Sequence, residues 1–204
     1  MSIIILRIFL LLSLFMVWLP GLLGLGSAKS ENFKPEQVKT RSTNFIYASW
    51  VIVYLLWIFI VALYCFKPES VGWFWKISPL DNDGVKIFAI VITCLGYYLL
   101  MLLGAFQVRK SIKPYIIKGE RTPLVTTGIF HYSRNPMYLS IDIGVLGTFL
   151  IMPNLPTLIM AAGMIAVLYA VSRDEEKRLL EIYGEEYEKY RRDVGLVFPK
   201  LKRG

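Results

Sequence analysis

The sequence predicts an all-α integral membrane protein of about five transmembrane helices, including one helical hairpin, followed by a cytoplasmic amphipathic helix. Hydrophobic residues make up 55% of the 204 residues, and the mean hydropathy is positive. These residues fall in long blocks instead of alternating with polar ones, which is typical of membrane proteins. A block of about 20 residues without charge has the length that crosses a hydrocarbon core of ~30 Å.

Four such blocks define the predicted crossings. They cover residues 3–25, 44–66, 85–108 and 137–171. The last block is too long for one crossing, and Pro153-Asn154-Leu155-Pro156 interrupts it. The two prolines remove backbone donors and the asparagine favours a turn, so this block predicts a helical hairpin. The total is then five crossings.

The charges between the crossings predict the orientation, because short cytoplasmic loops carry an excess of Lys and Arg. The segment between the first two blocks and the segment after the third are basic: Lys29, Lys34, Lys39 and Arg41, then Arg109, Lys110, Lys113, Lys118, Arg121 and Arg134. The loop of residues 67–84 has only two lysines beside three acidic residues. We therefore expect the N-terminus outside and the C-terminus in the cytoplasm.

The first block has a second interpretation. Arg7, the apolar run after it and Gly26-Ser27-Ala28 also match a signal peptide with a small-residue cleavage site. The weakly basic start and the long apolar stretch favour a retained crossing. The remaining topology is the same in both cases.

Several function classes are disfavoured by composition. The net charge is +8, and the basic residues that give it lie beside the apolar blocks. Attraction to anionic lipid headgroups explains these residues there, so they do not indicate nucleic-acid binding. Cys65 and Cys94 are single residues within apolar runs, which indicates packing and not zinc or a disulfide. His131 is the only histidine, so the sequence offers no His-rich metal site.

A polar connector, residues 124–138, leads into the hairpin. Asn135-Pro136 predicts a helix start, with Asn135 as N-cap and Pro136 at the first helical position. Arg134 would then lie beside the amides of a helix N-terminus, where a carboxylate can be held. The alternative is an ordinary capped helix with a snorkelling arginine. Asp142 lies inside the fourth block as a packing residue or one that lines a polar opening.

The tail predicts one helix over residues 173–192 that continues from the fifth crossing. Its apolar face contains Leu179, Leu180, Tyr183, Tyr187 and Tyr190, and its solvated face contains Glu181, Glu185, Glu188 and Arg192. Glu175 and Glu176 fall on the apolar side, as does Arg191. Inward carboxylates need partners, which are either a ligand or nearby Lys and Arg side chains.

These motifs carry a family resemblance. Gly128-x-Phe130-x-x-x-Arg134-Asn135-Pro136-Met137-Tyr138, Glu175-Glu176, Gly184-Glu185-Glu186-Tyr187-x-x-Tyr190 and Phe198-Pro199 occur in this order. The combination resembles the integral-membrane methyltransferases, which include isoprenylcysteine carboxyl methyltransferases and phospholipid N-methyltransferases. The resemblance covers about residues 108–200. It divides the chain into N-terminal transmembrane helices, 1–108, and a methyltransferase core, 109–204.

The resemblance implies that the connector and tail enclose S-adenosylmethionine at the cytoplasmic face while a lipophilic substrate enters between helices. It implies catalytic roles for Arg134 and Arg191, and cofactor contacts from Val125, Gly128, Asn135, Tyr138, Glu175 and Glu176. Asn135 stands where the family usually has the His of an Arg-His-Pro-x-Tyr motif. An amide forms hydrogen bonds but takes up no proton near neutral pH, so any base must be His131, Asp142 or a glutamate of the pair.

The implied reaction is direct methyl transfer from a sulfonium to a nucleophile held in line, with no metal. The shortage of bases favours a carboxylate or thiolate acceptor over an amine. The resemblance points to isoprenylcysteine carboxyl O-methyl transfer, with a phospholipid amine or a small thiol as alternatives. Two other classes stay open from the sequence: an NADPH-dependent sterol-type reductase and a noncatalytic membrane scaffold.

Overall fold

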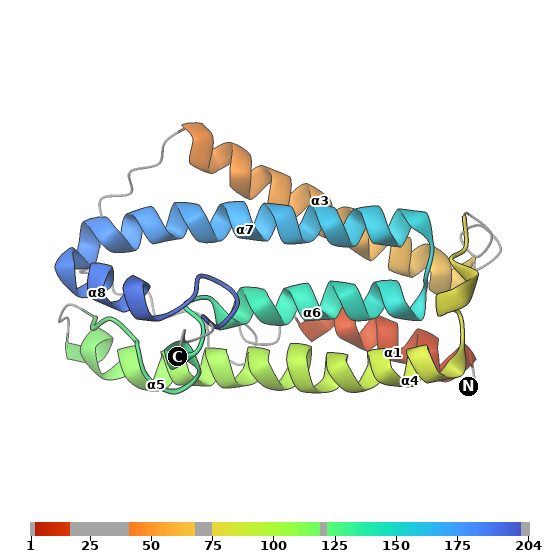
Figure 1. The fold of residues 1–204 in the computed structure, drawn as a ribbon, viewed down its shortest axis with the longest axis horizontal. Coiled ribbons are helices and arrows are strands. Elements are labelled where there is room, and N and C mark those ends of the chain that lie inside the picture. The colour runs from red at the N-terminus through yellow and green to blue at the C-terminus, as the bar shows by residue number, and fades with distance from the viewer. Residues whose placement is uncertain (1–2, 17–40, 68–74, 119–121, 201–204) are drawn as a thin grey trace.

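The computed structural model describes residues 3–16, 41–67, 75–118 and 122–200. Within these ranges the chain is helical and contains no β-strand, so the all-α prediction is confirmed there. Most of the long helices run along one axis, the helix of residues 41–66 is inclined to them, and successive helices alternate in direction (Figure 1). The helices are α1 (Ile3–Met16), α3 (Arg41–Phe66), α4 (Asp83–Ile92), α5 (Leu100–Lys118), α6 (Pro136–Ile151), α7 (Leu155–Tyr183) and α8 (Glu185–Asp193).

Three of the described helical stretches are long and apolar enough to cross a membrane. They are Ala48–Phe66, Asp83–Ser111 and Leu155–Tyr183. The second is continuous through α4, the π-helical segment η3 (Thr93–Leu99) and α5. Ile3–Phe15 and Pro136–Ile151 are apolar but shorter. Residues 17–25 of the predicted first crossing and Gly26-Ser27-Ala28 lie outside the described residues, so the count of five stays a prediction.

The predicted hairpin is confirmed. α6 ends at Ile151 and α7 begins at Leu155. Asn154 caps α7, because its Oδ1 accepts from the Thr157 amide at 3.0 Å while Thr157 Oγ1 accepts from the Asn154 amide at 3.4 Å. This reciprocal pair satisfies two amides that the helix itself leaves free. α6 and α7 then lie antiparallel against each other (Figure 1).

Small residues allow α6 to pack closely on η3. A Cβ at Gly144 would lie 2.9 Å from the Tyr97 ring, and one at Gly147 would lie 2.0 Å from Thr93 Oγ1. Close approach through small residues is the usual way in which membrane helices pack. This contact fixes which side of α6 faces η3, and therefore which side is left for α7.

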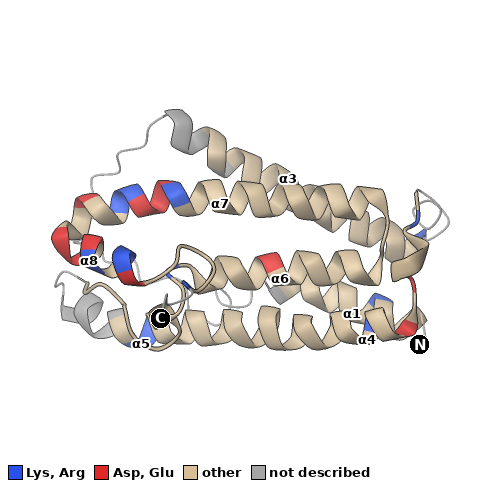
Figure 2. Cartoon of the chain, in the orientation of Figure 1, with Lys and Arg blue, Asp and Glu red and all other residues tan. Residues whose placement is uncertain are grey.

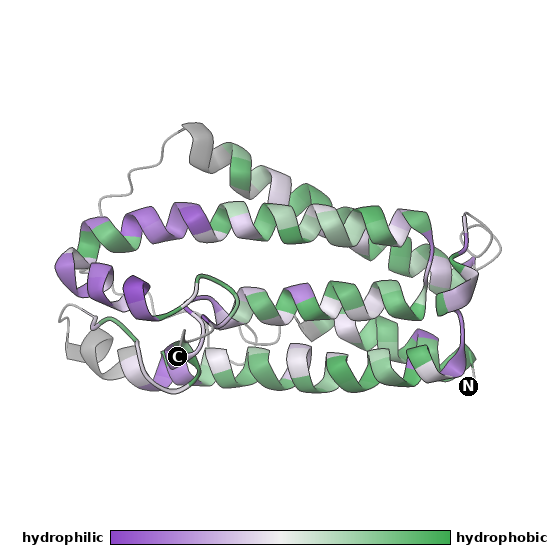
Figure 3. Ribbon diagram, viewed as in Figure 1, coloured by the Kyte–Doolittle hydropathy of each residue, from purple (hydrophilic) through white to green (hydrophobic). Residues whose placement is uncertain are grey.

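The core joins the N-terminal helix to the rest of the bundle. The hydroxyls of Tyr54 and Tyr97 donate to the carbonyls of Leu14 and Ser13, both at 3.0 Å. Outside this core, large apolar side chains such as Phe59 and Ile159 are more than half exposed. Such a surface suits a lipid environment, and hydrophobic residues dominate the middle of the bundle (Figure 3).

Candidate active site

Charged residues gather at the end of the bundle where α5 and α7 finish and α6 begins (Figure 2). The connector approaches this end as an irregular segment with one 3-10 turn, η4 (Gly128–His131). The end of α7, α8 and the segment after α8 lie against it. The connector, the end of α7, α8 and the segment after α8 therefore meet here, and the candidate site predicted from the sequence lies among them.

Arg134 and Glu176 form a buried ion pair at the centre of this region. Arg134 Nη1 contacts Glu176 Oε1, and the two side chains are only 8% and 6% exposed. Arg173, which is 56% exposed, donates from Nη1 to the other carboxylate oxygen at 3.1 Å. The Arg134 guanidinium carbon also lies 5.9 Å from the centre of the Tyr187 ring. Paired in this way, the two charges can stay buried.

Tyr138 and Glu175 make a second link between the same helices. The Tyr138 hydroxyl donates to Glu175 Oε1 at 2.7 Å. Tyr138 lies one turn after Arg134 in the chain, and Glu175 directly precedes Glu176. The prediction that both glutamates face inward is thus confirmed in the geometry. Glu176 pairs with arginines, as the alternative interpretation anticipated.

The predicted single tail helix is wrong. α7 ends at Tyr183, Gly184 adopts φ +53°, and α8 starts at Glu185. Glycine takes positive φ without a steric penalty, so it allows the chain to turn at this point. The turn brings Tyr187 and Tyr190 into a buried cluster with residues of α7 and the connector. The residues of the predicted apolar face do pack together, but they lie on two helices instead of one.

Asn135 occupies the predicted N-cap position but does not cap α6 with its side chain. Its Nδ2 donates instead to the Leu196 carbonyl at 3.0 Å, and its own amide donates to Ser133 Oγ at 3.1 Å. The expectation of a side-chain cap is therefore wrong, because the returning tail takes up this amide. Pro136 is at the start of the helix as predicted.

The segment after α8 returns along the connector and was not predicted. The Arg134 amide donates to the Gly195 carbonyl at 3.0 Å, and Ser133 Oγ donates to the Val197 carbonyl at 2.6 Å. The Tyr190 hydroxyl donates to the Phe130 carbonyl at 2.5 Å. Gly195 is the sequence feature that could have indicated this tight segment, because a Cβ there would lie 1.8 Å from the Phe198 carbonyl oxygen.

Burial raises the pKa of the Tyr187 and Tyr190 phenols above the ordinary value of 10. The positive charge of Arg134 opposes this shift at both residues. Both phenols therefore stay protonated at neutral pH. This keeps Tyr190 a hydrogen-bond donor to the connector.

Part of this chain is similar to known proteins. Residues 87–186 match a family model described as phospholipid methyltransferase. Over these residues, just under half of its length, the chain is similar to the integral-membrane methyltransferases. No solved structure matches this chain.

Curated relatives include enzymes of two acceptor types. Methanethiol S-methyltransferases from Pseudomonas deceptionensis and Crocosphaera subtropica are 26% and 28% identical over 80% and 78% of this chain. A protein-S-isoprenylcysteine O-methyltransferase from Schizosaccharomyces pombe is 32% identical over 55% of this chain and 49% of its own length. The chain spans about 60% of the length of the first two.

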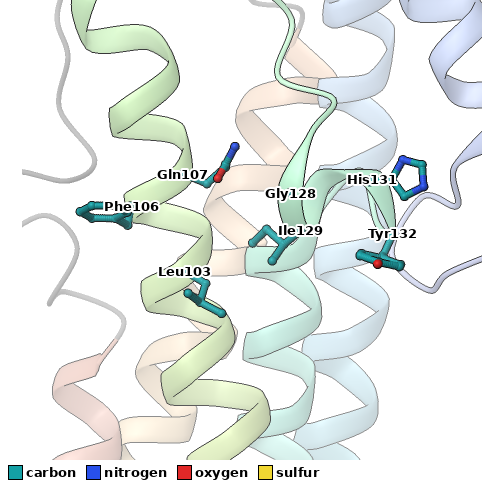
Figure 4. Close-up of a pocket in the computed structure, with 7 residues that line it drawn as sticks. All are labelled: Leu103, Phe106, Gln107, Gly128, Ile129, His131 and Tyr132. Carbon is teal, nitrogen blue, oxygen red and sulfur yellow. The ribbon is translucent and has the colours of Figure 1, made fainter.

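The other site residues predicted from the sequence lie apart from the Arg134–Glu176 ion pair. Gly128, at φ +62°, opens onto a cavity of about 450 Å³ between α5 and the connector (Figure 4). Gln107 forms part of the wall of this cavity, and its Nε2 donates to Thr127 Oγ1 at 3.3 Å. Val125 is half-buried. Arg191 is not joined to Arg134 but pairs with Glu188 at 2.7 Å near the surface.

A second cavity, of about 1010 Å³, lies between the connector and the tail. Its walls come from Thr126, His131 and Tyr132 on one side and Glu186, Lys189, Tyr190, Arg192, Asp193, Val194, Pro199 and Lys200 on the other. The predicted cofactor residues do not line this cavity. Bonds within the chain engage all four polar residues of the predicted site: Asn135, Tyr138, Glu175 and Glu176. They form a closed polar cluster, and the open space lies beside the same connector.

Proposed function

We propose that this chain is an S-adenosylmethionine-dependent methyltransferase that acts on a lipophilic acceptor at the cytoplasmic face of the membrane. One observation carries the proposal. The connector residues of the family motif meet its glutamate pair, Arg134 with Glu176 and Tyr138 with Glu175, although 37 to 42 residues separate them. The relatives named above are all methyltransferases.

The chemistry of this cluster fits the proposed cofactor. S-adenosylmethionine has an ammonium, a carboxylate and sugar hydroxyls. Glu175 and Glu176 would hold the ammonium or the hydroxyls, with Tyr138 and Asn135 as further hydrogen-bonding groups. Arg134 Nε is buried and has no hydrogen-bond partner within the described part of the chain, so it would donate to the carboxylate. When bound, the cofactor supplies an electrophilic methyl group.

The protein's own contribution is to position the acceptor and exclude water. Methyl transfer between two held groups gains most from orientation, and a membrane-embedded site keeps water away from the reacting atoms. The closed cluster of the connector and α7 would fix the donor end, while the acceptor would enter laterally from the lipid between helices. Residues 109–204 would contain this machinery.

Two acceptor classes are supported by separate observations. The relatives that match the larger share of this chain are named methanethiol S-methyltransferases, which supports a small lipophilic thiol. The isoprenylcysteine O-methyltransferases match a smaller share of this chain at higher identity, which supports the carboxylate of a prenylated cysteine. Asn135 takes up no proton near neutral pH, so an amine of a phospholipid is the weaker candidate.

The proposed topology has five crossings with the site in the cytoplasm. α1, α3, the α4–α5 helix, α6 and α7 alternate in direction, which supports five crossings (Figure 1). The basic residues near the site support a cytoplasmic face for that end. α6 would cross as the shorter arm of the hairpin, where local thinning of the bilayer or neighbouring helices cover the difference in length.

The full chain in lipid nanodiscs tests the proposal directly. Isothermal titration with S-adenosylmethionine, its demethylated product and NADPH should give binding of the first two. Labelled methyl donor should then label methanethiol or a prenylated cysteine more than phosphatidylethanolamine. Binding of NADPH alone would overturn the proposal in favour of a reductase, and binding of none of the three would favour a scaffold.

A further inference from the structure

Asp142 is a buried acidic side chain that the site described above does not use. It is the only charged residue of α6 and is 4% exposed (Figure 2). Its Oδ1 is buried and has no hydrogen-bond partner among the residues that the structure describes. Keeping such an oxygen within an apolar helix costs free energy unless a ligand or a proton satisfies it.

The side of α6 that carries Asp142 faces the candidate site. Residues four apart share a helix face, and Tyr138, four residues earlier, binds Glu175 of α7. Gly144 and Gly147 occupy the opposite side, where they meet η3. Asp142 therefore lies about 6 Å further along α6 than Tyr138. In the antiparallel α7, the same step from Glu175 reaches Val171, which is buried.

The other candidate bases of this region are already engaged or lie outside it. Glu176 is held by Arg134 and Arg173. Glu175 accepts from Tyr138. His131 is exposed and lines the cavities on the outer side of the connector. Asn135 cannot take up a proton near neutral pH.

We infer that Asp142 accepts the proton of a lipophilic thiol acceptor, one helical turn below the Tyr138–Glu175 pair. This inference rests on the proposed function. The acceptor S–H bond breaks as its proton moves to Asp142 Oδ1. The sulfur lone pair then forms a bond to the methyl carbon of a sulfonium donor, whose own carbon–sulfur bond breaks to leave a neutral thioether. Asp142 afterwards returns its proton to water.

The kinetic test compares Asp142→Asn with the wild type, using the full chain in nanodiscs with methanethiol and S-adenosylmethionine. The amide keeps the shape of the side chain but cannot serve as a base, so kcat should fall about 100-fold or more. The KM for the donor should stay within about threefold. Thr148→Val is the matched control, since it removes a buried hydroxyl of α6 that donates to the Gly144 carbonyl within the same helix. This control should keep the wild-type rate.

Infrared difference spectroscopy gives a readout without turnover. Methanethiol added to the wild type without methyl donor should produce the carbonyl band of a protonated carboxylic acid, and Asp142→Asn should not produce it. Absence of the band in the wild type overturns the inference even if the variant folds poorly.

The outcomes separate the two proposals. If the wild type methylates the thiol and Asp142→Asn does so at the same rate, the role of Asp142 is wrong and the proposed function stands. If the wild type neither binds S-adenosylmethionine nor methylates any acceptor, the proposed function fails and the role of Asp142 fails with it.

Discussion

The Arg134 guanidinium is buried against the Glu176 carboxylate, and 42 residues of chain separate the two. The pair joins the start of α6 to the end of α7 at the site. Arg173, the second arginine on Glu176, is 56% exposed and so shields this carboxylate less than Arg134 does. The site and the fold at this end therefore depend on the same contact.

Glu176→Ala should lower the free energy of unfolding by about 3–5 kcal/mol, because it leaves the Arg134 charge buried without its main partner. Donor binding should weaken as well. Glu181→Ala is the matched control, since Glu181 is exposed on the same helix. Denaturant unfolding in detergent and titration calorimetry measure both effects, and equal small effects of the two variants would contradict the inward placement of Glu176.

The double variant Arg134→Met/Glu176→Leu tests whether the loss comes from an unpaired charge. Apolar pairs of similar volume often replace buried ion pairs at little cost. We expect the double variant to unfold at higher denaturant concentration than Glu176→Ala alone. Its donor binding should nevertheless be lost, which would separate stability from function.

Asn135→His should retain donor binding, because an imidazole N–H can donate to the Leu196 carbonyl as the amide does now. Asn135→Ala removes this bond and should cost about 0.5–1.5 kcal/mol. Calorimetry with S-adenosylmethionine distinguishes the two variants. Complete loss of binding in Asn135→His would show that the returning tail admits only the smaller side chain.

Gly195→Ala should detach the returning tail. The added Cβ would lie 1.8 Å from the Phe198 carbonyl oxygen, so the backbone must move, at a cost of about 1–3 kcal/mol. Gly163→Ala is the control, because a Cβ there meets nothing within 4 Å, and alanine stabilises a helix interior by up to about 1 kcal/mol. Hydrogen exchange of residues 194–197 should rise only in the first variant.

The Tyr190 phenol should ionise at a higher pH than an exposed tyrosine does. Its folded-state pKa is raised above 10 by burial, so its contribution to stability is present below pH 10 and is lost as the pH rises toward the folded-state pKa. Absorbance titration of folded Tyr190→Phe just above pH 10 should therefore match the wild type. In denaturant the wild type should show one more ionising phenol, and a difference already in the folded state would contradict the burial of Tyr190.

A reporter fused after residue 204 tests the proposed orientation. A fluorescent protein that matures only in the cytoplasm should be bright there, and a phosphatase that folds only outside should be inactive. The reverse pattern would place the site on the outer face and contradict the charge argument.

Local patterns predicted the membrane helices and part of the site. The hairpin followed from Pro153 to Pro156, since prolines and a capping asparagine act within a few residues. The inward glutamates followed from helical spacing alone, because the spacing that packs Leu179 and Leu180 against the tyrosine cluster also turns Glu175 and Glu176 inward.

Features that depend on distant parts of the chain were not predicted. The chain turns at Gly184, but the helical spacing of apolar residues continues on both sides of it and does not indicate the turn. The Asn135 side chain could cap α6 only through its oxygen, and the orientation it takes, with Nδ2 donating to the Leu196 carbonyl, depends on the returning tail. The position of Asp142 inside an apolar block was visible in the sequence, but that its Oδ1 meets no hydrogen-bond partner among the described residues depends on the helices packed around it.

The π-helical segment η3 is the place in this crossing that best absorbs a change of chain length. A π turn is an α-helix that holds one additional residue, so deleting one residue between Thr93 and Leu99 would restore an ordinary helix and leave α4 and α5 nearly in register. Deleting one residue of α5 between Leu100 and Phe106 would instead rotate the rest of that helix by about 100°. Gln107, which now touches the connector, would then point elsewhere. Two deletions that a hydropathy profile cannot tell apart would thus have opposite effects on the contact between α5 and the connector.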